Sequence, residues 1–202
     1  MEHPDLGPAH VQIRGMGPGD LDAVVQLAEH AFGPGYYRLA DVRDLLDRCT
    51  IGTDAFAYVA VDGVVGEDVV GARFTLPPGR WNAGRGAALH PSRWPAPALE
   101  SAYFQSAFVA PARARRGIGR ALAQRALADL ERLGASAVIA HAWKESPRDG
   151  ARRYLERLGF QQVAICRHYW AHVDYRCPRC GAPPCTCTAL EMVLKLPRSA
   201  GT

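Results

Sequence analysis

The segment Phe108-Val-Ala-Pro-Ala-Arg-Ala-Arg-Arg-Gly-Ile-Gly-Arg-Ala-Leu122 carries the most information about the fold. Its apolar start is typical of a strand that stops at Pro111, and its Gly-x-Gly element opens a helix. The first N–H groups of a helix have no partner within it and lie at the positive end of its dipole, so they can bind an anion. Glycine lets the backbone approach that anion closely, and the arginines add positive charge. The segment therefore predicts a strand–turn–helix unit that binds an anion such as phosphate.

Other readings of this segment are weaker. A dinucleotide-binding turn needs a third glycine where Leu122 stands, and a P-loop needs Gly-Lys-Ser/Thr, which the chain lacks. The four arginines between positions 113 and 120 could form a nucleic-acid patch, but no aromatic residue is interleaved with them. The formal net charge is only +4. Nucleic acid is therefore not the expected partner.

Hydrophobic periodicity around the segment predicts a mixed α/β domain. Strands are expected at residues 11–14, 56–61, 69–76, 102–109, 137–143, 160–169 and 190–196, and helices at residues 21–31, 40–49, 117–133 and 149–158. Residues 77–97, rich in proline and glycine, are expected to form a loop without regular structure.

Length and composition fit one globular domain. The chain has 202 residues, of which 48% are hydrophobic and 22% are charged. Residues 101–112 form the longest uncharged stretch and are too few to span a membrane. The first thirty residues include acids and no apolar core, so no signal peptide is expected. We expect a soluble, cytoplasmic protein with a flexible N-terminus at 1–10, a single domain at 11–196 and a tail at 197–202.

A second segment, Ala151-Arg-Arg-Tyr-Leu-Glu-Arg-Leu-Gly-Phe160, supports a specific family. Together with Val-x-Pro, the Arg-rich turn and Gly-Ile-Gly-Arg-Ala-Leu, it resembles the GNAT N-acetyltransferase superfamily, in element order as well as in motifs. The resemblance covers roughly Val11 to Leu196, apart from a Cys-rich insertion at 171–189. It implies the GNAT acyl-CoA N-acyltransferase fold, in which helices flank a mixed central sheet. It also implies transfer of an acetyl group from acetyl-CoA to a primary amine, directly within a ternary complex.

The resemblance implies where acetyl-CoA binds. The strand end would offer backbone groups to the pantetheine arm, and the loop and helix start would hold the pyrophosphate. The implied contacts are Phe108, Val109, Ala110, Arg113, Arg115, Arg116, Gly117, Ile118, Gly119 and Arg120. A backbone N–H near Val109 would meet the oxyanion. The chain departs from the family at Ala114, where Gln or Arg is usual, and Arg113 or Arg115 could compensate.

The catalytic groups are less constrained by the sequence. An alkylamine has a pKa of roughly 10.4, so it must lose a proton before it attacks. Glu100, just before the central strand, is the candidate base and Glu145 is a further carboxylate, although either could be a solvated strand-end residue. His141 lies within an apolar strand and is expected to be a core histidine. The family often has a tyrosine general acid where Leu155 stands. Tyr154 precedes it and is the candidate acid, with a core role as the alternative.

Four of the six cysteines fall between positions 177 and 187. The sequence Cys177-Pro-Arg-Cys180-Gly181 is typical of a zinc knuckle, and Cys185 and Cys187 could complete a four-sulfur structural zinc site. A redox disulfide pair and free thiols are the alternatives. Cys49 and Cys166 are expected in the core.

The acceptor is expected to be a small-molecule or protein amine, with no membrane partner, and a homodimer is possible. Residues 77–97 and the segment after Trp170 could wall the acceptor side. Because Ala114 and Leu155 replace usual family residues, an alternative function stays open. It is a catalytically weak GNAT-fold protein that binds CoA or a partner and carries a structural zinc site.

Overall fold

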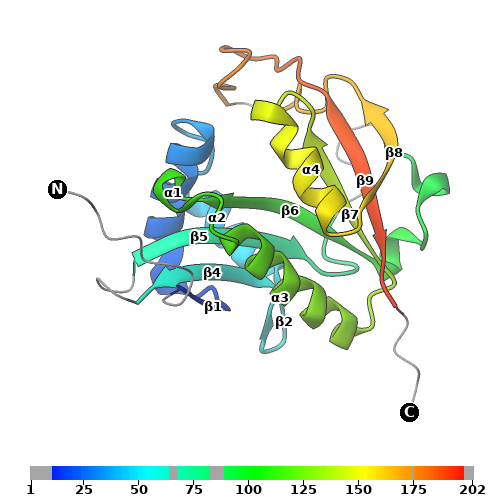
Figure 1. Cartoon of the computed structure of the whole chain (residues 1–202), viewed down its shortest axis with the longest axis horizontal. Coiled ribbons are helices and arrows are strands. Elements are labelled where there is room, and N and C mark those ends of the chain that lie inside the picture. The colour runs from blue at the N-terminus through cyan, green and yellow to red at the C-terminus, as the bar shows by residue number, and fades with distance from the viewer. Residues whose placement is uncertain (1–10, 64–67, 82–88, 174, 198–202) are drawn as a thin grey trace.

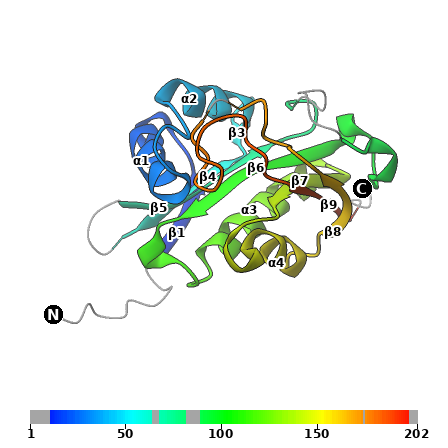
Figure 2. The same cartoon turned by 90° about the horizontal axis from the view of Figure 1, so that it is seen from above.

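The computed structural model describes residues 11–63, 68–81, 89–173 and 175–197. These residues form a seven-stranded mixed sheet of order β1-β4-β5-β6-β7-β9-β8. Figure 1 shows the sheet and Figure 2 shows its two covered faces: α1 and α2 lie on one, α3 and α4 on the other. The expected flexible N-terminus, residues 198–202 of the expected tail and part of the 77–97 loop lie outside the described residues. Among the described helices, none is long and apolar enough to cross a membrane.

The elements follow the predicted order. They are β1 (Val11–Gly15), α1 (Leu21–Phe32), α2 (Leu39–Arg48), β2 (Thr50–Ile51), β3 (Asp54–Ala55), β4 (Ala57–Asp62), β5 (Asp68–Leu76), β6 (Ser101–Val109), α3 (Ile118–Leu133), β7 (Ala137–Trp143), α4 (Gly150–Arg157), β8 (Gln161–Cys166) and β9 (Ala189–Lys195). The sequence did not predict the short β2–β3 hairpin. The predicted mixed α/β fold is confirmed.

Two predicted segments differ from the structure. The strand expected at 160–169 ends at Cys166, because the chain turns there and His168 has a left-handed φ of 54°. The loop at 77–97 is not structureless in its described part. Residues Pro91–Arg93 form a short 3-10 turn, and Trp94 is buried against Ile139 and Val193 of the sheet.

The centre of the sheet is tightly packed on both faces. All six residues of β4 are buried. On β5, Gly71 faces α3, and a Cβ added to it would lie 3.1 Å from Ile118 and 3.3 Å from Leu122. The missing side chain therefore lets the start of α3 lie close to the sheet, at the end of the predicted anion-binding turn.

Strands β6 and β7 diverge partway along their length. They pair in parallel only from Ser101–Ala137 to Phe104–Ala140, although β6 continues to Val109 and β7 to Trp143. The register of β6 against β5 shifts at the same point, which leaves Gln105 as a bulged residue. A bulge bends its strand, so it accounts for the departure of β6 from β7. We call the region between residues 105–109 and 141–143 the opening.

Candidate functional site

The loop at residues 111–120, which we call the phosphate loop, connects the end of β6 to α3. Arg115 and Gly117 have left-handed φ values of 62° and 81° within otherwise right-handed or extended backbone. Such alternation gathers successive N–H groups into a concave surface that suits an anion. No side chain caps α3, and its first turn holds no acidic residue. The local geometry therefore suits the anion that the sequence predicts here, and phosphate binding itself stays a prediction.

The four arginines of the phosphate loop have different surroundings. Arg113 forms an ion pair with Asp62, a buried residue at the end of β4. This pair ties the loop to the sheet. Arg115 and Arg120 are exposed, and Arg116 is half-buried. Arg115 and Arg120 are thus the two best placed to add mobile positive charge beside the uncapped helix start.

Tyr154 of α4 reaches the phosphate loop. Its hydroxyl donates a 2.8 Å hydrogen bond to the carbonyl of Gly119 and accepts a 2.7 Å bond from Nη2 of Arg73. Leu155, at the usual family position of the tyrosine, is buried in the core. The side chain of Tyr154 therefore ends in a polar contact beside the opening, on the α3/α4 face of the sheet.

A hydrogen-bonded network occupies the opposite face at the same level. Side chains alternate along a strand, so Tyr103 faces away from Phe104 and from α4. Its hydroxyl lies 3.0 Å from Nδ1 of His141 and 3.2 Å from the hydroxyl of Tyr169. The ring of His141 stacks on that of Tyr169, and Nε2 of His141 lies 3.4 Å from Oε2 of Glu191. His141 and Glu191 are cross-strand partners of β7 and β9.

The network borders the opening through the main chain of His141. The imidazole is only 1% exposed, yet the residue as a whole is half-buried. Its exposed part is therefore the backbone, because the ladder between β7 and β6 ends one residue earlier, at Ala140. A molecule in the opening would lie beside that backbone.

Burial and hydrogen bonding fix the charges of this network. Burial lowers the pKa of His141 below its ordinary value, although Glu191 opposes the shift. For Glu191, burial raises the pKa, but the nearby His141 imidazole and the hydrogen bond from Trp94 outweigh it and the pKa is lowered. Burial raises the pKa of Tyr169 to about 12 and that of Tyr103 well above 10. Near neutral pH, the network holds one carboxylate, one neutral imidazole and two protonated phenols.

Two residues of the 89–97 segment contact the carboxylate of Glu191 in addition to His141. Trp94 donates a 2.7 Å hydrogen bond to Oε1, and Nδ1 of His90 lies 3.6 Å from Oε2. Ligand-type atoms of His90, Cys166 and Glu191 lie within 4.8 Å of one another. The carboxylate is thus enclosed by one tryptophan, two histidines and a thiol.

The two candidate carboxylates lie away from this network. Glu100 precedes the first residue of β6 and accepts a 2.9 Å hydrogen bond from Ser136, so the length of β6 separates it from the phosphate loop. Glu145 accepts the backbone N–H of Thr188 at 3.0 Å and pairs with Arg179 at 3.1 Å. Neither carboxylate joins the Tyr103–His141 network. Through these two contacts, Glu145 instead binds the Cys-rich segment to the end of β7.

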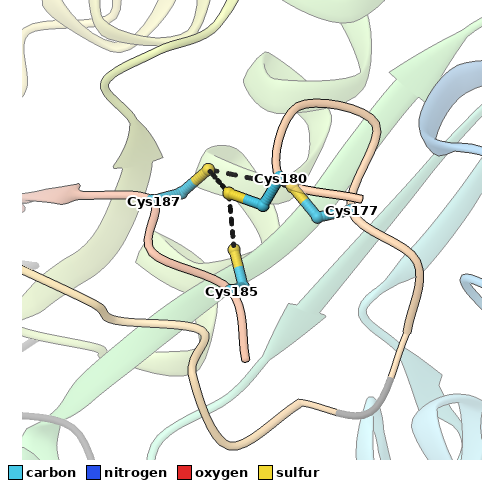
Figure 3. A group of neighbouring side chains, drawn as sticks. All are labelled: Cys177, Cys180, Cys185 and Cys187. Atoms are coloured by element: carbon cyan, nitrogen blue, oxygen red, sulfur yellow. Dashed lines mark hydrogen bonds between the residues drawn. The ribbon is translucent and has the colours of Figure 1, made fainter. Parts of the chain in front are cut away.

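The four clustered cysteines meet at one point, as Figure 3 shows. The sulfur of Cys187 lies 3.8 Å from that of Cys177 and 3.5 Å from that of Cys180, and Cys180 and Cys185 are 3.9 Å apart. Tetrahedral zinc with Zn–S bonds of about 2.3 Å gives S–S edges of about 3.8 Å. A disulfide would bring two sulfurs to about 2.05 Å. The measured separations match those of a tetrahedral four-sulfur site and exclude a disulfide between these pairs.

The local backbone of this cluster favours ionisation of Cys177 and Cys180, whereas burial raises the pKa values of Cys185 and Cys187. Gly181, with a φ of 77°, turns the chain so that its N–H bonds the carbonyl of Cys177 at 2.9 Å. The pKa of Cys180 is lowered to about 6, because Thr186 donates to its sulfur from both the hydroxyl and the backbone N–H. Burial opposes ionisation of Cys177, but N–H groups of Cys180 and Arg179 lower its pKa overall.

The Cys-rich segment, residues 171–189, lies on the α1/α2 face beside the opening (Figure 2). The carbonyl of Cys187 accepts a 3.1 Å hydrogen bond from the backbone N–H of Tyr169. Tyr175 packs edge-on against Tyr36, which follows α1. The neighbouring Tyr37 bonds Ser106 of β6 at 2.9 Å. The segment therefore connects to both sides of the opening, to β7 through Tyr169 and to β6 through the tyrosines at 175, 36 and 37.

Sequence reasoning missed the Tyr103–His141–Glu191 network. His141 was assigned to the core, and its partner Glu191 lies far along the chain. One signal was available. The last strand, Ala189–Lys195, is buried over its first five residues, and Glu191 is a charged residue in its middle. A charge at such a position requires a buried partner.

Comparison with known sequences gives one family. Residues 21–160 match the sequence model of the family described as "Acetyltransferase (GNAT) family". A search of curated proteins finds no significant match.

Solved structures give the same fold. The ribosomal-protein-S18-alanine N-acetyltransferase from Escherichia coli is 18% identical, with 95% of this chain and 96% of that chain covered and a TM-score of 0.64. A GCN5-related N-acetyltransferase from Kribbella flavida is 21% identical, with 94% and 100% covered and a TM-score of 0.61. The protein yncA from Salmonella typhimurium, solved with its cofactor acetyl-CoA, is 20% identical, with 96% and 98% covered and a TM-score of 0.61. At these identities the likeness is one of fold.

Proposed function

Because this chain belongs to the acetyltransferase (GNAT) family, we propose that it moves the acetyl group of acetyl-CoA directly to a primary amine of a small molecule or protein. The observation that carries this proposal is the divergence of β6 from β7 after the Phe104–Ala140 pair. The opening that results is a place where acetyl-CoA and the acceptor amine can come together, with Tyr154 on one face of the sheet and the Tyr103–His141 network on the other.

The phosphate loop fits the donor. The concave N–H groups around Arg115 and Gly117 and the uncapped start of α3 suit a pyrophosphate. Beyond the bulge, the edge of β6 that faces β7 makes no ladder with it, so backbone groups of Phe108 and Val109 can bind an amide-containing arm. The N–H and carbonyl of Ala110 are already bonded to Val70 and Arg113. Acetyl-CoA, when bound, supplies the activated acetyl thioester.

On the α1/α2 face, we assign His141 as the general base. In this assignment Nε2–H faces the charged Glu191, and Nδ1 accepts the proton of Tyr103, whose hydroxyl accepts that of Tyr169. A proton lost by the acceptor amine can then pass through a tyrosine hydroxyl to a neutral imidazole. Glu100, at the other end of β6, does not take part in this proposal.

The position of the thiols supports transfer without an acyl-enzyme. None of the six cysteines lies on β6 or β7. Steady-state rates measured over a grid of both substrates should give intersecting double-reciprocal lines, as a ternary complex requires. Parallel lines would require a covalent intermediate and would contradict the proposal.

The defining experiment combines binding and turnover. The purified protein is incubated with acetyl-CoA and a panel of small amines and peptides with free amino termini, and free thiol and acetylated product are both measured. We expect thermal stabilisation by acetyl-CoA and product on at least one class of amine. Stabilisation without product on any acceptor would support the alternative, a CoA-binding sensor. No stabilisation would contradict donor binding itself.

We also propose that Cys177, Cys180, Cys185 and Cys187 hold one structural zinc ion. The S–S separations match a tetrahedral site, and with four thiolates bound the ion has no open position for catalysis. Cys187 contacts Tyr169, and Tyr175 contacts Tyr36. The role of the zinc ion would therefore be to hold in place the segment after Trp170, which lines the acceptor side of the opening in this proposal. Free thiols of this kind also fit a reducing compartment such as the cytoplasm.

Metal analysis tests the zinc site and the base together. We expect one equivalent of zinc per chain, lost in Cys177→Ser together with Cys180→Ser. Zinc that stays bound in that double variant would contradict the four-cysteine site. A second equivalent that depends on His90 would occupy the His90–Cys166–Glu191 group and would contradict a free His141–Glu191 pair as the base.

A further inference from the structure

Arg73 of β5 is a buried cation whose hydrogen bonds are incomplete. The residue is 2% exposed. Only Nη2 has a partner, the hydroxyl of Tyr154, whereas Nε and Nη1 are buried without any. Within the described residues no carboxylate pairs with Arg73. Besides the Tyr154 hydroxyl, the face of the Phe104 ring, 3.9 Å from Cζ, offers it negative potential.

Such a group is costly to keep. Arginine stays charged in proteins, and a buried charge without a counter-charge substantially destabilises the folded state. One cation–π contact compensates only part of this cost. A buried, unpaired guanidinium at this position is therefore best explained by a function in which a negative charge arrives beside it.

The position of Arg73 identifies that negative charge. Phe104 is the last residue of β6 that pairs with β7, so the guanidinium lies at the apex of the opening. Through Tyr154 it connects to the carbonyl of Gly119 in the phosphate loop. Arg73 thus lies between the expected pyrophosphate site and the place where the strands diverge. The donor thioester should lie there, so this inference rests on the proposed function.

We infer that Arg73 is the counter-charge for the thiolate that leaves during acetyl transfer. The amine nitrogen forms a bond to the thioester carbonyl carbon, the C–S bond breaks, and its electron pair stays on sulfur. The proton lost by the amine goes to His141 and then to solvent. Arg73 stabilises the thiolate by its charge and its two unpartnered nitrogens, while the Tyr154 hydroxyl, which donates to Gly119, accepts from Nη2 and holds the guanidinium in place. The thiolate takes a proton from solvent when CoA departs.

The test measures binding, so it does not depend on turnover. The affinities of CoA and of S-ethyl-CoA, which cannot ionise at sulfur, are compared by calorimetry from about pH 6 to about pH 9. If Arg73 stabilises a thiolate, the affinity of CoA relative to S-ethyl-CoA rises with pH in the wild type. A bound thiol pKa one unit lower gives a rise of about tenfold. Arg73→Met should abolish the rise, Arg73→Lys should keep part of it, and Arg14→Met on β1 should leave it unchanged.

The outcomes separate this inference from the proposed function. If both ligands bind with the same pH dependence in the wild type, the thiolate role is wrong and donor binding stands. If neither binds, the proposed function fails. A rise that persists in Arg73→Met would also overturn the inference.

Stability gives a second readout. Replacing a costly buried charge by an apolar side chain of similar shape is often neutral or stabilising. We therefore expect the unfolding midpoint of Arg73→Met to equal or exceed that of the wild type, while acetyl transfer falls. A clearly lower midpoint with unchanged transfer would make Arg73 a structural residue.

A second acyl donor identifies the anion. If the negative charge were a carboxylate on the acyl group, succinyl-CoA would be preferred over acetyl-CoA, and Arg73→Met would reverse the preference. That result would replace the thiolate in the inference. If succinyl-CoA is not preferred and the affinity of CoA relative to S-ethyl-CoA still rises with pH, the result supports the thiolate role of Arg73.

Discussion

The two faces of the opening carry opposite buried charges. On the α3/α4 face, Arg73 is a cation with two unpartnered nitrogens, and no acid in the described part of the chain pairs with it. On the α1/α2 face, Glu191 is a fully buried anion surrounded by donors. The sheet keeps these charges apart, since Tyr103 and Phe104 are adjacent residues whose side chains point to opposite faces. The difference matches the proposed chemistry, in which a thiolate leaves on one face and a proton is accepted on the other.

The largest expected effect comes from a substitution in the network on the α1/α2 face, which carries the Glu191 anion and which we call the anionic face. His141→Gln removes the proposed base but keeps a side chain that can bond Tyr103. We expect kcat/KM for the amine to fall by about 10²–10⁴-fold, the usual contribution of a general base. CoA affinity should stay within about twofold, because His141 lies on the opposite face from the phosphate loop. Rates from initial-velocity assays and affinities from calorimetry check both statements.

His30→Gln is the matched control, because His30 is exposed on α1 and lies outside the network, with its Nδ1 2.7 Å from the carbonyl oxygen of Gln26. A His141→Gln variant with more than about half of the wild-type rate would remove His141 as the base, given the loss expected for one.

The two faces also differ in how far the sequence predicts them. The phosphate loop is a contiguous segment, so its strand end, glycines and helix start could be predicted from local patterns alone. The network on the other face joins residues 90–103, 141, 169 and 191, which only the sheet register brings together. His141 was interpreted as a core histidine because its strand is apolar. The imidazole is indeed buried, but the local pattern cannot reveal its carboxylate partner.

The same contrast explains Glu100 and Tyr154. Glu100 was chosen because it precedes the central strand, but adjacency along the chain says nothing about which end of a strand borders the opening. The bulge at Gln105 decides that, and no residue pattern marked it. Tyr154 was open between an acid and a core residue, since helical periodicity places its ring in the apolar stripe. The structure adds the polar contact of its hydroxyl, which depends on Arg73 from a different element.

The next prediction tests whether the Cys-rich segment belongs to the anionic face. Cys177→Ser with Cys180→Ser should remove zinc and loosen Tyr169, so the KM for the amine should rise severalfold while CoA affinity changes little. Zinc present at 1,000 times its Kd would add about 4 kcal/mol to the free energy of unfolding, and this is lost with the site. For a chain of this size that corresponds to a Tm lower by roughly 10 °C. Amine kinetics, calorimetry and thermal unfolding give the three values.

Cys49→Ala is the control, since Cys49 is buried but outside the cluster. It should lower the Tm without changing zinc content or the KM for the amine. If the double variant weakened CoA binding and amine binding equally, the segment would not be specific to one face.

A smaller effect concerns stability and pH. The pKa of His141 in the folded chain lies below the 6.5 of an unfolded histidine, so the unfolded state binds the proton more readily. The stabilising contribution is complete above about pH 6.5 and is lost as the pH falls toward the folded pKa, with a slope of at most about 1.4 kcal/mol per pH unit. Denaturant unfolding at closely spaced pH values should show this slope in the wild type and a smaller one in His141→Gln.

The neighbours of His141 define the window for this measurement. Glu191, His90, Tyr103, Tyr169 and Cys166 are the titratable groups near it. The pKa of Glu191 is lowered from 4.5, so its own contribution is present above that value and is lost only at lower pH. The two phenols have pKa values raised above 10 and stay protonated throughout. An equal slope in both proteins between about pH 5 and 6.5 would contradict a neutral, buried His141.

The smallest expected effect lies on the cationic face, at Arg120. Its side chain is exposed beside the start of α3, so its attraction for phosphate is screened by water and salt. Arg120→Ala should weaken CoA binding only about two- to fivefold at low salt, and less at high salt. Arg157→Ala, an equally exposed change on α4, should have no effect. The binding that remains at high salt measures the share of the backbone N–H groups, which salt screens much less. A loss of more than about fiftyfold would mean that side-chain charge holds the donor and that the left-handed turn at Arg115 and Gly117 does not.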